Sequence, residues 1–302
     1  EVINDQVFVI FNLLTESREE LKDPEYMEDI SDESLDDAEL GVVYKNQNYG
    51  SVSGAVNVGG ITGAMAVEFD LDPEDDIFKQ GSRSLNFKYL TTAILKDCIN
   101  HGKITAKKDY TGGIAGRMDL GIVYGCENYG DIESTEGDYV GGIAGASYAT
   151  IDHSFALSSL TGKNYIGGIA GYGHDISNSY TLVDIIEATE WVGTIAGKAE
   201  GKVSNNYYVH ETIAAIDGIS YSEKASPLAY TELLQVESLP EPFTDFHLTF
   251  IADGNIVEKI PFEYGDSFDL SLLPVVPNKE GHDSQWEDFD SNHMTFNTII
   301  EA

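Results

Sequence analysis

The chain has 302 residues, of which 17 are basic and 52 are acidic, so its formal charge is −35. A protein this negative repels nucleic acid and anionic membrane surfaces, which excludes both as partners. No apolar run approaches the roughly 20 residues of a membrane span, and the chain does not open with the charged and apolar stretches of a signal peptide. We therefore expect no membrane insertion within this chain, with any signal or anchor outside it.

Residues 1–40 are predicted to form an acidic N-terminal segment. The strand-like run at 7–11 could extend or cover the first strands of the fold that follows, because an exposed strand edge invites aggregation. Residues 16–39 carry twelve acidic side chains and only two basic ones. Such a run is typical of a solvated loop, with calcium or a basic partner as the functional alternative.

The phrase Val-Gly-Gly-Ile-Ala-Gly, or a near copy of it, occurs five times between residues 58 and 197. The steps between its isoleucines are 53, 29, 26 and 26 residues, the first being about two periods long, and these isoleucines are Ile61, Ile114, Ile143, Ile169 and Ile195. The last copy has Thr194 in place of a glycine. Self-similar units at this period indicate a repeat architecture.

A second pattern recurs about 20 residues before each phrase: an apolar residue, followed four positions later by another residue expected to be buried. The pairs are Val42/Asn46, Ile94/Cys98, Ile122/Cys126, Ile151/Phe155, Ile176/Tyr180 and Val203/Tyr207. In the first three copies an Asn-x-Gly turn follows, beginning at Asn48, Asn100 and Asn128. The unit is therefore strand, turn, short strand, loop and glycine-rich strand, in about six partial copies.

These units predict an all-β fold, a parallel β-solenoid over residues 41–238. Each copy is rich in Val, Ile, Tyr and Thr and is bounded by Asn and Gly, which is the chemistry of strands. A unit too short to enclose its own core must stack on its neighbours, about 4.8 Å apart. We expect the paired glycines to serve a corner with positive φ or a close approach of backbone between coils.

Residues 68–93 interrupt the period and are predicted to leave the solenoid as an insertion. Asp70, Asp72 and Glu74 have the spacing of the first ligands of a calcium loop. Asp75 stands where that loop needs glycine, and Gly81 stands where it needs glutamate. A calcium site at these carboxylates is therefore the alternative to an acidic surface loop, and no other cofactor is expected.

Cys98 and Cys126 occupy one column of consecutive copies, so the solenoid places them as neighbours. A strand spacing lies within the Cα separation that permits a disulfide. The alternative is that both are small core residues in one column.

An aromatic residue stands just before or within one residue of four of the glycine phrases, at Tyr110, Tyr139, Tyr165 and Trp191. Stacked aromatic side chains usually stabilise cross-strand pairing. If this column faces outward, it would offer a strip on which sugars stack, so these four residues are the candidate binding site.

The C-terminal part of the sequence predicts a different unit. A short helix is expected at 226–234, capping the last coil, and the prolines at 240 and 242 indicate a linker. Residues 243–302 are predicted to form a small β-grasp-like module. It has a hairpin turn at Asp253–Asn255, a core anchor at Trp286 and a closing strand near 294–300.

The glycine phrase and its upstream Asn-Tyr-Gly resemble the GLUG repeats of large bacterial surface proteins. Residues 243–302 resemble the Listeria/Bacteroides repeat of internalin-type surface proteins, at Asp253-Gly254, Gly265, Pro274, Pro277, Gly281 and Trp286. Both resemblances imply an extracellular protein without catalytic residues, which would be an adhesin or stalk that presents a surface to a host protein or glycan.

We therefore expect a non-enzymatic, monomeric, secreted or cell-surface protein. The alternatives are a parallel β-helix enzyme that degrades polysaccharides and a spacer without a ligand. An enzyme would concentrate carboxylates in one groove, whereas the acidic residues of this sequence are spread over the N-terminal segment, the insertion and the tail.

Overall fold

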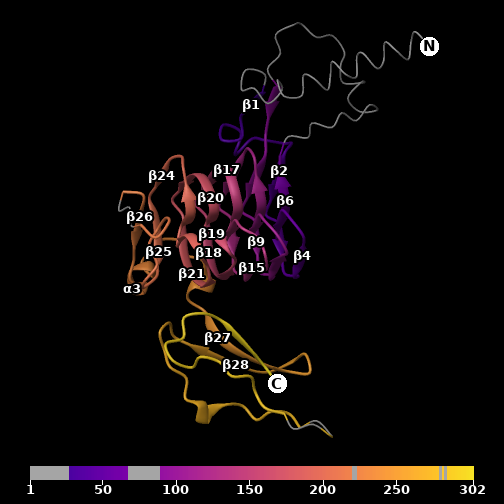
Figure 1. Cartoon of the computed structure of the whole chain (residues 1–302), viewed down its shortest axis with the longest axis vertical. Helices are drawn as coiled ribbons and strands as arrows, with labels where there is room; N and C mark the ends of the chain where they lie inside the picture. Colours follow the sequence, from indigo (N-terminus) through magenta and orange to yellow (C-terminus); the bar gives the residue numbers. More distant parts are fainter. Residues whose placement is uncertain (1–26, 67–88, 220–222, 279–280, 282–283) are drawn as a thin grey trace, which may run out of the picture.

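The computed structural model describes residues 27–66, 89–219, 223–278, 281 and 284–302. It is nearly all β, with a solenoid of stacked parallel strands and a smaller C-terminal module beyond it (Figure 1). This confirms the predicted all-β, solenoid-like fold. Within the described residues no helix is long and apolar enough to cross a membrane.

Three parallel sheets form the walls of the solenoid. The first contains β2 (Val42–Tyr44), β6 (Thr62–Met65), β8 (Ile94–Lys96), β12 (Ala115–Met118), β13 (Ile122–Tyr124), β17 (Ala144–Asp152), β20 (Ala170–Ser177), β23 (Ala196–Ala199) and β24 (Val203–Ser204). The second contains β3 (Gln47–Asn48), β4 (Val52–Gly54), β9 (Ile99–Asn100), β10 (Ile104–Ala106), β14 (Glu127–Asn128), β15 (Ile132–Ser134), β18 (Phe155–Thr161), β21 (Tyr180–Glu187), β25 (Asn206–Val209) and β26 (Ala225–Pro227). The third contains β5 (Val58–Gly59), β11 (Thr111–Gly112), β16 (Val140–Gly141), β19 (Asn164–Gly167) and β22 (Glu190–Gly193).

The strand register corrects one predicted column. Ile151 lies opposite Val123, and Phe155 lies opposite Glu127, so the column slips by one residue after the third copy. The cause is that coils two and three carry two adjacent apolar residues, Ile94-Leu95 and Ile122-Val123. The second of each pair is the one in register with Ile151 and the later coils.

The glycine phrases stack in register across all five coils, and each isoleucine from Ile114 onward is fully buried. The predicted close approach accounts for the glycines: a Cβ on Gly113 would overlap the carbonyl oxygen of Gly142 and the side chain of Asn128. Positive φ belongs instead to the residue before each phrase, in the column Asn57, Tyr110, Tyr139, Tyr165 and Trp191. The corner is therefore made by a side-chain-bearing residue, and the glycines allow the coils to nest.

The Asn-x-Gly turns form a ladder of amides inside the second sheet. Asn48 Nδ2 donates to Asn100 Oδ1 at 2.7 Å, and Asn100 Nδ2 donates to Asn128 Oδ1 at 2.7 Å. Each amide also closes its own turn, as Asn128 does by accepting from the N–H of Gly130 at 3.3 Å. Asn100 and Asn128 are fully buried, so the ladder satisfies polar groups that would otherwise be unpaired.

The described part of the N-terminal segment lies against the corner of the solenoid. Strand β1 (Met27–Asp29) pairs in parallel with β7 (Tyr89–Thr91), which directly precedes the second coil. The carboxylate of Asp29 accepts from the N–H of Gly121 at 2.6 Å, and Lys96 Nζ pairs with Asp36 at 2.7 Å. The predicted strand at 7–11 lies outside the described residues.

The predicted short helix is present as α3 (Tyr230–Leu233), although it covers the outer side of the second sheet. Its Leu233 packs with Leu157, Leu182 and Val209, which are in register on β18, β21 and β25. The predicted linker is also docked, because η2 (Glu241–Phe243) buries Phe243 completely against Tyr129 and Phe155. The expectation of an extended linker was wrong: a 3-10 turn begins at Glu241 after Pro240, with Pro242 as its second residue, and Phe243 anchors that turn.

The C-terminal module is a three-stranded sheet of order β28-β27-β29. β27 (Phe246–Ala252) pairs antiparallel with β28 (Asn255–Phe262) and parallel with β29 (Thr298–Glu301). The 3-10 turn η3 (Leu270–Leu272) lies between β28 and β29 in the chain. The hairpin turn is as predicted, with positive φ at Asp253 and Gly254. Trp286 is buried against Phe250, and its indole N–H donates to the carbonyl of Pro274 at 2.7 Å.

Candidate functional site: an aromatic ladder and its open end

The four predicted aromatic residues stack into a continuous ladder along one corner of the solenoid. The ring centroids of Tyr110 and Tyr139 are 5.0 Å apart, those of Tyr139 and Tyr165 are 4.6 Å apart, and those of Tyr165 and Trp191 are 5.6 Å apart. The interplanar angles are 18°, 12° and 4°. We call Tyr110, Tyr139, Tyr165 and Trp191 the aromatic ladder.

The ladder follows from the positive φ of its members. A left-handed residue turns the chain between the second and third sheets, so the same position recurs in each coil one strand spacing from the last. Each ring is half-buried, and burial raises the pKa of Tyr110 and of Tyr139. The phenols of Tyr110 and Tyr139 are therefore neutral at physiological pH.

A second, shorter pair of rings and two cations flank the ladder. The ring centroids of Tyr148 and Tyr172 lie 5.0 Å apart, and burial, together with the hydrogen bond from Tyr172 to Glu200, raises the pKa of Tyr172 to about 12. The Arg117 guanidinium lies 5.2 Å from the Tyr110 ring centre, and Lys198 Nζ lies 5.8 Å from that of Trp191. Both distances fall within the range of cation–π attraction.

Stacking changes what this strip can bind. Inside the ladder each ring face is covered by the next ring, so Tyr139 and Tyr165 present only their edges. The predicted sugar-stacking strip therefore has an open ring face only at an end of the ladder, because a sugar must lie flat on a ring.

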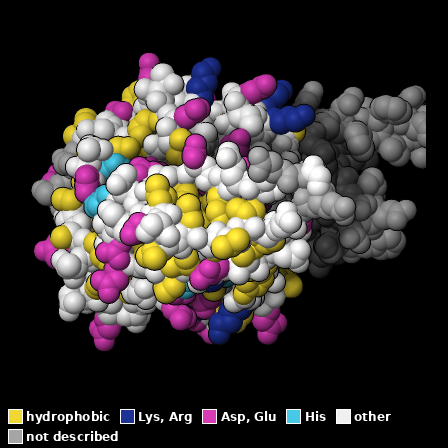
Figure 2. Space-filling view, turned by 90° about the horizontal axis from the view of Figure 1, so that it is seen from below, with side chains coloured by type: hydrophobic (Ala, Val, Ile, Leu, Met, Phe, Trp, Pro, Cys, Tyr) yellow, Lys and Arg dark blue, Asp and Glu magenta, His cyan; other side chains and the backbone are white. Residues whose placement is uncertain are grey.

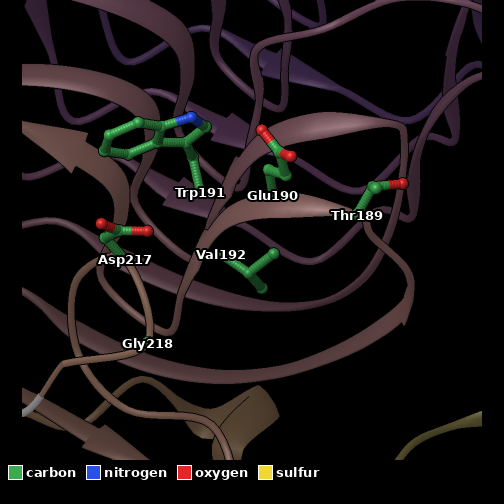
Figure 3. A pocket seen from close by; sticks show the side chains of 6 residues that line it. All are labelled: Thr189, Glu190, Trp191, Val192, Asp217 and Gly218. Atoms are coloured by element: carbon green, nitrogen blue, oxygen red, sulfur yellow. The ribbon is translucent and has the colours of Figure 1, made fainter.

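The open face is at Trp191, where a shallow pocket of about 410 Å³ is lined by Thr189, Glu190, Trp191, Val192, Asp217 and Gly218. Figure 3 shows the indole with the carboxylate of Asp217 beneath it and that of Glu190 beside it. Neither carboxylate has a hydrogen-bond or ion-pair partner within the described ranges. The pocket thus combines an aromatic face with two free acceptors that carry negative charge.

The two cysteines are free and buried. The N–H of Cys98 donates to Cys126 Sγ at 3.4 Å, and burial raises the pKa of the Cys126 thiol. Their column continues with Ser154 and Ser179, where the N–H of Ser154 donates to Ser179 Oγ at 3.2 Å. Cys126 and Ser179 thus each accept a hydrogen bond from the N–H of the preceding coil, so the cysteines are corner residues of the core.

The candidate calcium ligands Asp70, Asp72 and Glu74 lie outside the described residues. Among the residues that are described, no group of three or more His, Cys, Asp and Glu side chains is arranged to hold a metal ion.

Asp29, Asp32, Asp152 and Asp175 form an acidic corner that no pattern in the sequence predicts. Burial and the charges of the other three raise the pKa of Asp32. Asp152 accepts from Ser177 and Asn178, and Asp175 accepts from the N–H of Lys202 at 2.6 Å. Only the repeat register and the return of the N-terminal segment bring these residues together, so no local motif could have revealed the corner.

Comparisons with known protein families, curated proteins and solved structures find no match to this chain.

Proposed function

We propose that the chain is a non-enzymatic protein of the cell surface or extracellular space, an adhesin or stalk that presents a binding surface to a host protein or glycan. The aromatic ladder carries this proposal, because it places four half-exposed rings in register on the outside of a rigid solenoid. Tyr, Trp and Arg are the residues enriched where proteins bind partners.

The geometry favours the Trp191 end as the point of strongest contact. An aromatic side chain contributes most when one face is free to be covered by the ligand, as large buried aromatic groups do in interfaces. The remaining rings hold Trp191 in place through stacking and offer their edges to a larger partner.

The acidic corner supports a second candidate, a β-helix enzyme that degrades polysaccharides. Such an enzyme needs a pair of carboxylates that act as acid and base. Three of the four aspartates at the corner already bond to backbone N–H groups or to neighbouring side chains. Asp32 is the one carboxylate left there without such a bond in the described structure, so we rank the enzyme below the binding protein.

A third candidate, a spacer without a ligand, would use the ladder only to stiffen the corner. The unpaired carboxylates beside Trp191 argue for a ligand, because stiffening requires no charged groups at the ladder's end.

A binding screen tests the proposal. The purified chain is applied to a glycan array and to extracellular-matrix proteins, with and without calcium and at two salt concentrations. We expect a specific hit that Trp191→Ala and Tyr165→Ala remove while circular dichroism shows the fold intact. If the wild-type chain binds none of the glycans or proteins tested, the spacer is favoured. If the chain cleaves a polysaccharide and Asp32→Asn abolishes that cleavage, the enzyme is favoured.

A further inference from the structure

The aromatic ladder ends at Trp191, although the solenoid continues for part of another coil beyond it. The indole stacks on Tyr165 and has no second ring neighbour among the described residues. The chain of the next coil does continue at this end, because the N–H groups of Thr194 and Ile195 donate to the carbonyls of Ala214 and Ala215 at 2.9 Å. That coil brings Asp217 and Gly218 beside Trp191, and none of its described residues places a ring over the indole, where the pocket lies.

The polar side chains that line the pocket beside Trp191 are mainly hydrogen-bond acceptors. Glu190 and Asp217 each bring a carboxylate that has no partner in the described part of the chain, and Thr189 adds one hydroxyl. The nearest cation to the ring, Lys198, is held by Glu200 at 2.6 Å and so does not neutralise the pocket. A ligand with planar cationic character would compensate both carboxylates and cover the indole face at once.

We propose that the pocket binds the guanidinium of an arginine side chain, presented by a basic segment of the partner. A guanidinium is planar, stacks on aromatic faces and donates paired hydrogen bonds to carboxylates. The rung spacing of 4.6–5.6 Å in the ladder is within the cation–π range. A neutral sugar can donate hydrogen bonds to the two carboxylates but does not neutralise their charge, and an anion is repelled by a chain of charge −35.

This inference rests on the proposed function and names the chemistry of the group bound at that site. It is tested by NMR on the indole N–H resonances of the full chain, which has two tryptophans. Trp286 is buried and bonded to Pro274, so its resonance serves as an internal reference. The probes are a capped Gly-Arg-Gly peptide, the matched peptide with neutral citrulline, and the matched lysine peptide.

We expect a saturable shift of the Trp191 resonance with the arginine peptide, and at least tenfold weaker binding of the citrulline peptide. The lysine peptide, with its rounder and more strongly hydrated cation, is expected between the two. The double variant Glu190→Gln/Asp217→Asn should weaken the arginine peptide at least tenfold.

The matched control is Glu136→Gln/Glu237→Gln, which removes the same charge at two exposed residues outside the pocket lining and should bind as the wild type does. Equal binding of arginine and citrulline, equal loss in both double variants, or no shift of the Trp191 resonance would overturn the inference. A glycan or matrix-protein hit that survives Glu190→Gln/Asp217→Asn would overturn it while leaving the proposed function in place.

Discussion

Single amide side chains hold the coils of this solenoid together from within. Asn100 and Asn128 are fully buried, and each bonds both to its own turn and to the amide of a neighbouring coil. Asn48 performs the same role at the start of the ladder, where it is half-exposed. Each buried asparagine side chain should therefore contribute more to the free energy of unfolding than Asn48 does at the end of the solenoid.

Asn128→Ala is expected to lower the free energy of unfolding by about 2–4 kcal/mol, because in a dry interior it leaves the Gly130 N–H without its side-chain acceptor and removes one of the two acceptors of Asn100 Nδ2. Asn48→Ala should cost about 1 kcal/mol or less, since water reaches that position. Urea denaturation followed by circular dichroism measures both. Equal losses of stability in the two variants would contradict the larger role given to the buried asparagines of the amide ladder.

Asp32→Asn is expected to stabilise the protein at pH 7. The folded-state pKa of Asp32 is raised, so above that pKa the native state holds a charge that its surroundings disfavour. The gain should fade as the pH falls toward 3.8, where the carboxyl is increasingly protonated in both states. Thermal melts at pH 7 and pH 4 measure it, with Asp37→Asn as the charge-matched control; a lower melting temperature for Asp32→Asn at pH 7 would refute it.

At the scale of elements, the glycine-rich strands set how closely the coils approach. The first glycine of each phrase faces the backbone of the next coil, and the second faces the amide ladder or the residues that replace it. In the later coils Ala156 and Thr181 stand in the amide column, and Thr181 donates to the carbonyl of Thr194 at 2.8 Å. In the last phrase Thr194 replaces the second glycine. A side chain is accommodated there because the coil that follows is not a full repeat.

Gly113→Ala is expected to cost about 3 kcal/mol or more, because the added methyl meets backbone and a buried amide that cannot move aside. Gly50→Ala serves as the control. Its Cβ would have only Asn48 Oδ1 nearby, at 3.8 Å, and the change should cost about 0.5 kcal/mol or less. Chemical denaturation separates the two, and a Gly113→Ala protein as stable as Gly50→Ala would contradict the close packing of the coils.

The repeat, the strand chemistry and the glycine columns could be predicted from the sequence because they recur at a fixed period. The one-residue slip at Ile151 could not, since adjacent apolar residues leave open which of them faces the core. The aromatic ladder was visible as a column, but its covered ring faces depend on the left-handed corner. Asp217 joins Trp191 only through the irregular last coil, which carries no repeat signal.

At the scale of the whole molecule, the C-terminal module is fastened to the side of the solenoid. Phe243 and Phe246 belong to the same apolar cluster as Leu157 and Leu182 of the solenoid wall, and Tyr230 stacks on Tyr264 of the module at 4.1 Å. Seen from the module's end, apolar side chains gather between acidic ones (Figure 2). The exposed large apolar side chains of the module are Ile256, Leu270, Leu272, Val275 and Ile299.

Phe243→Ala is expected to release the module from the solenoid wall. Burial of a phenylalanine is worth about 3–5 kcal/mol when it is truncated to alanine, and here that energy holds two parts of the chain together. Small-angle X-ray scattering should show a larger radius of gyration, and proteases should cut between residues 234 and 245. The exposed Leu272→Ala should change neither, and an unchanged Phe243→Ala profile would show that the docking lies elsewhere.

We expect a partner to bind at the Trp191 end of the aromatic ladder. Biolayer interferometry compares Trp191→Ala with Tyr110→Ala against the glycans and matrix proteins of the screen. Tyr110 is the matched control, because it is the other end of the same ladder, has a cation near its ring as Trp191 does, and does not line the pocket. We predict that the wild type and Tyr110→Ala bind alike and that Trp191→Ala loses at least tenfold in affinity. Binding that is unaffected by Trp191→Ala, or a wild-type chain that binds nothing, would contradict the claim.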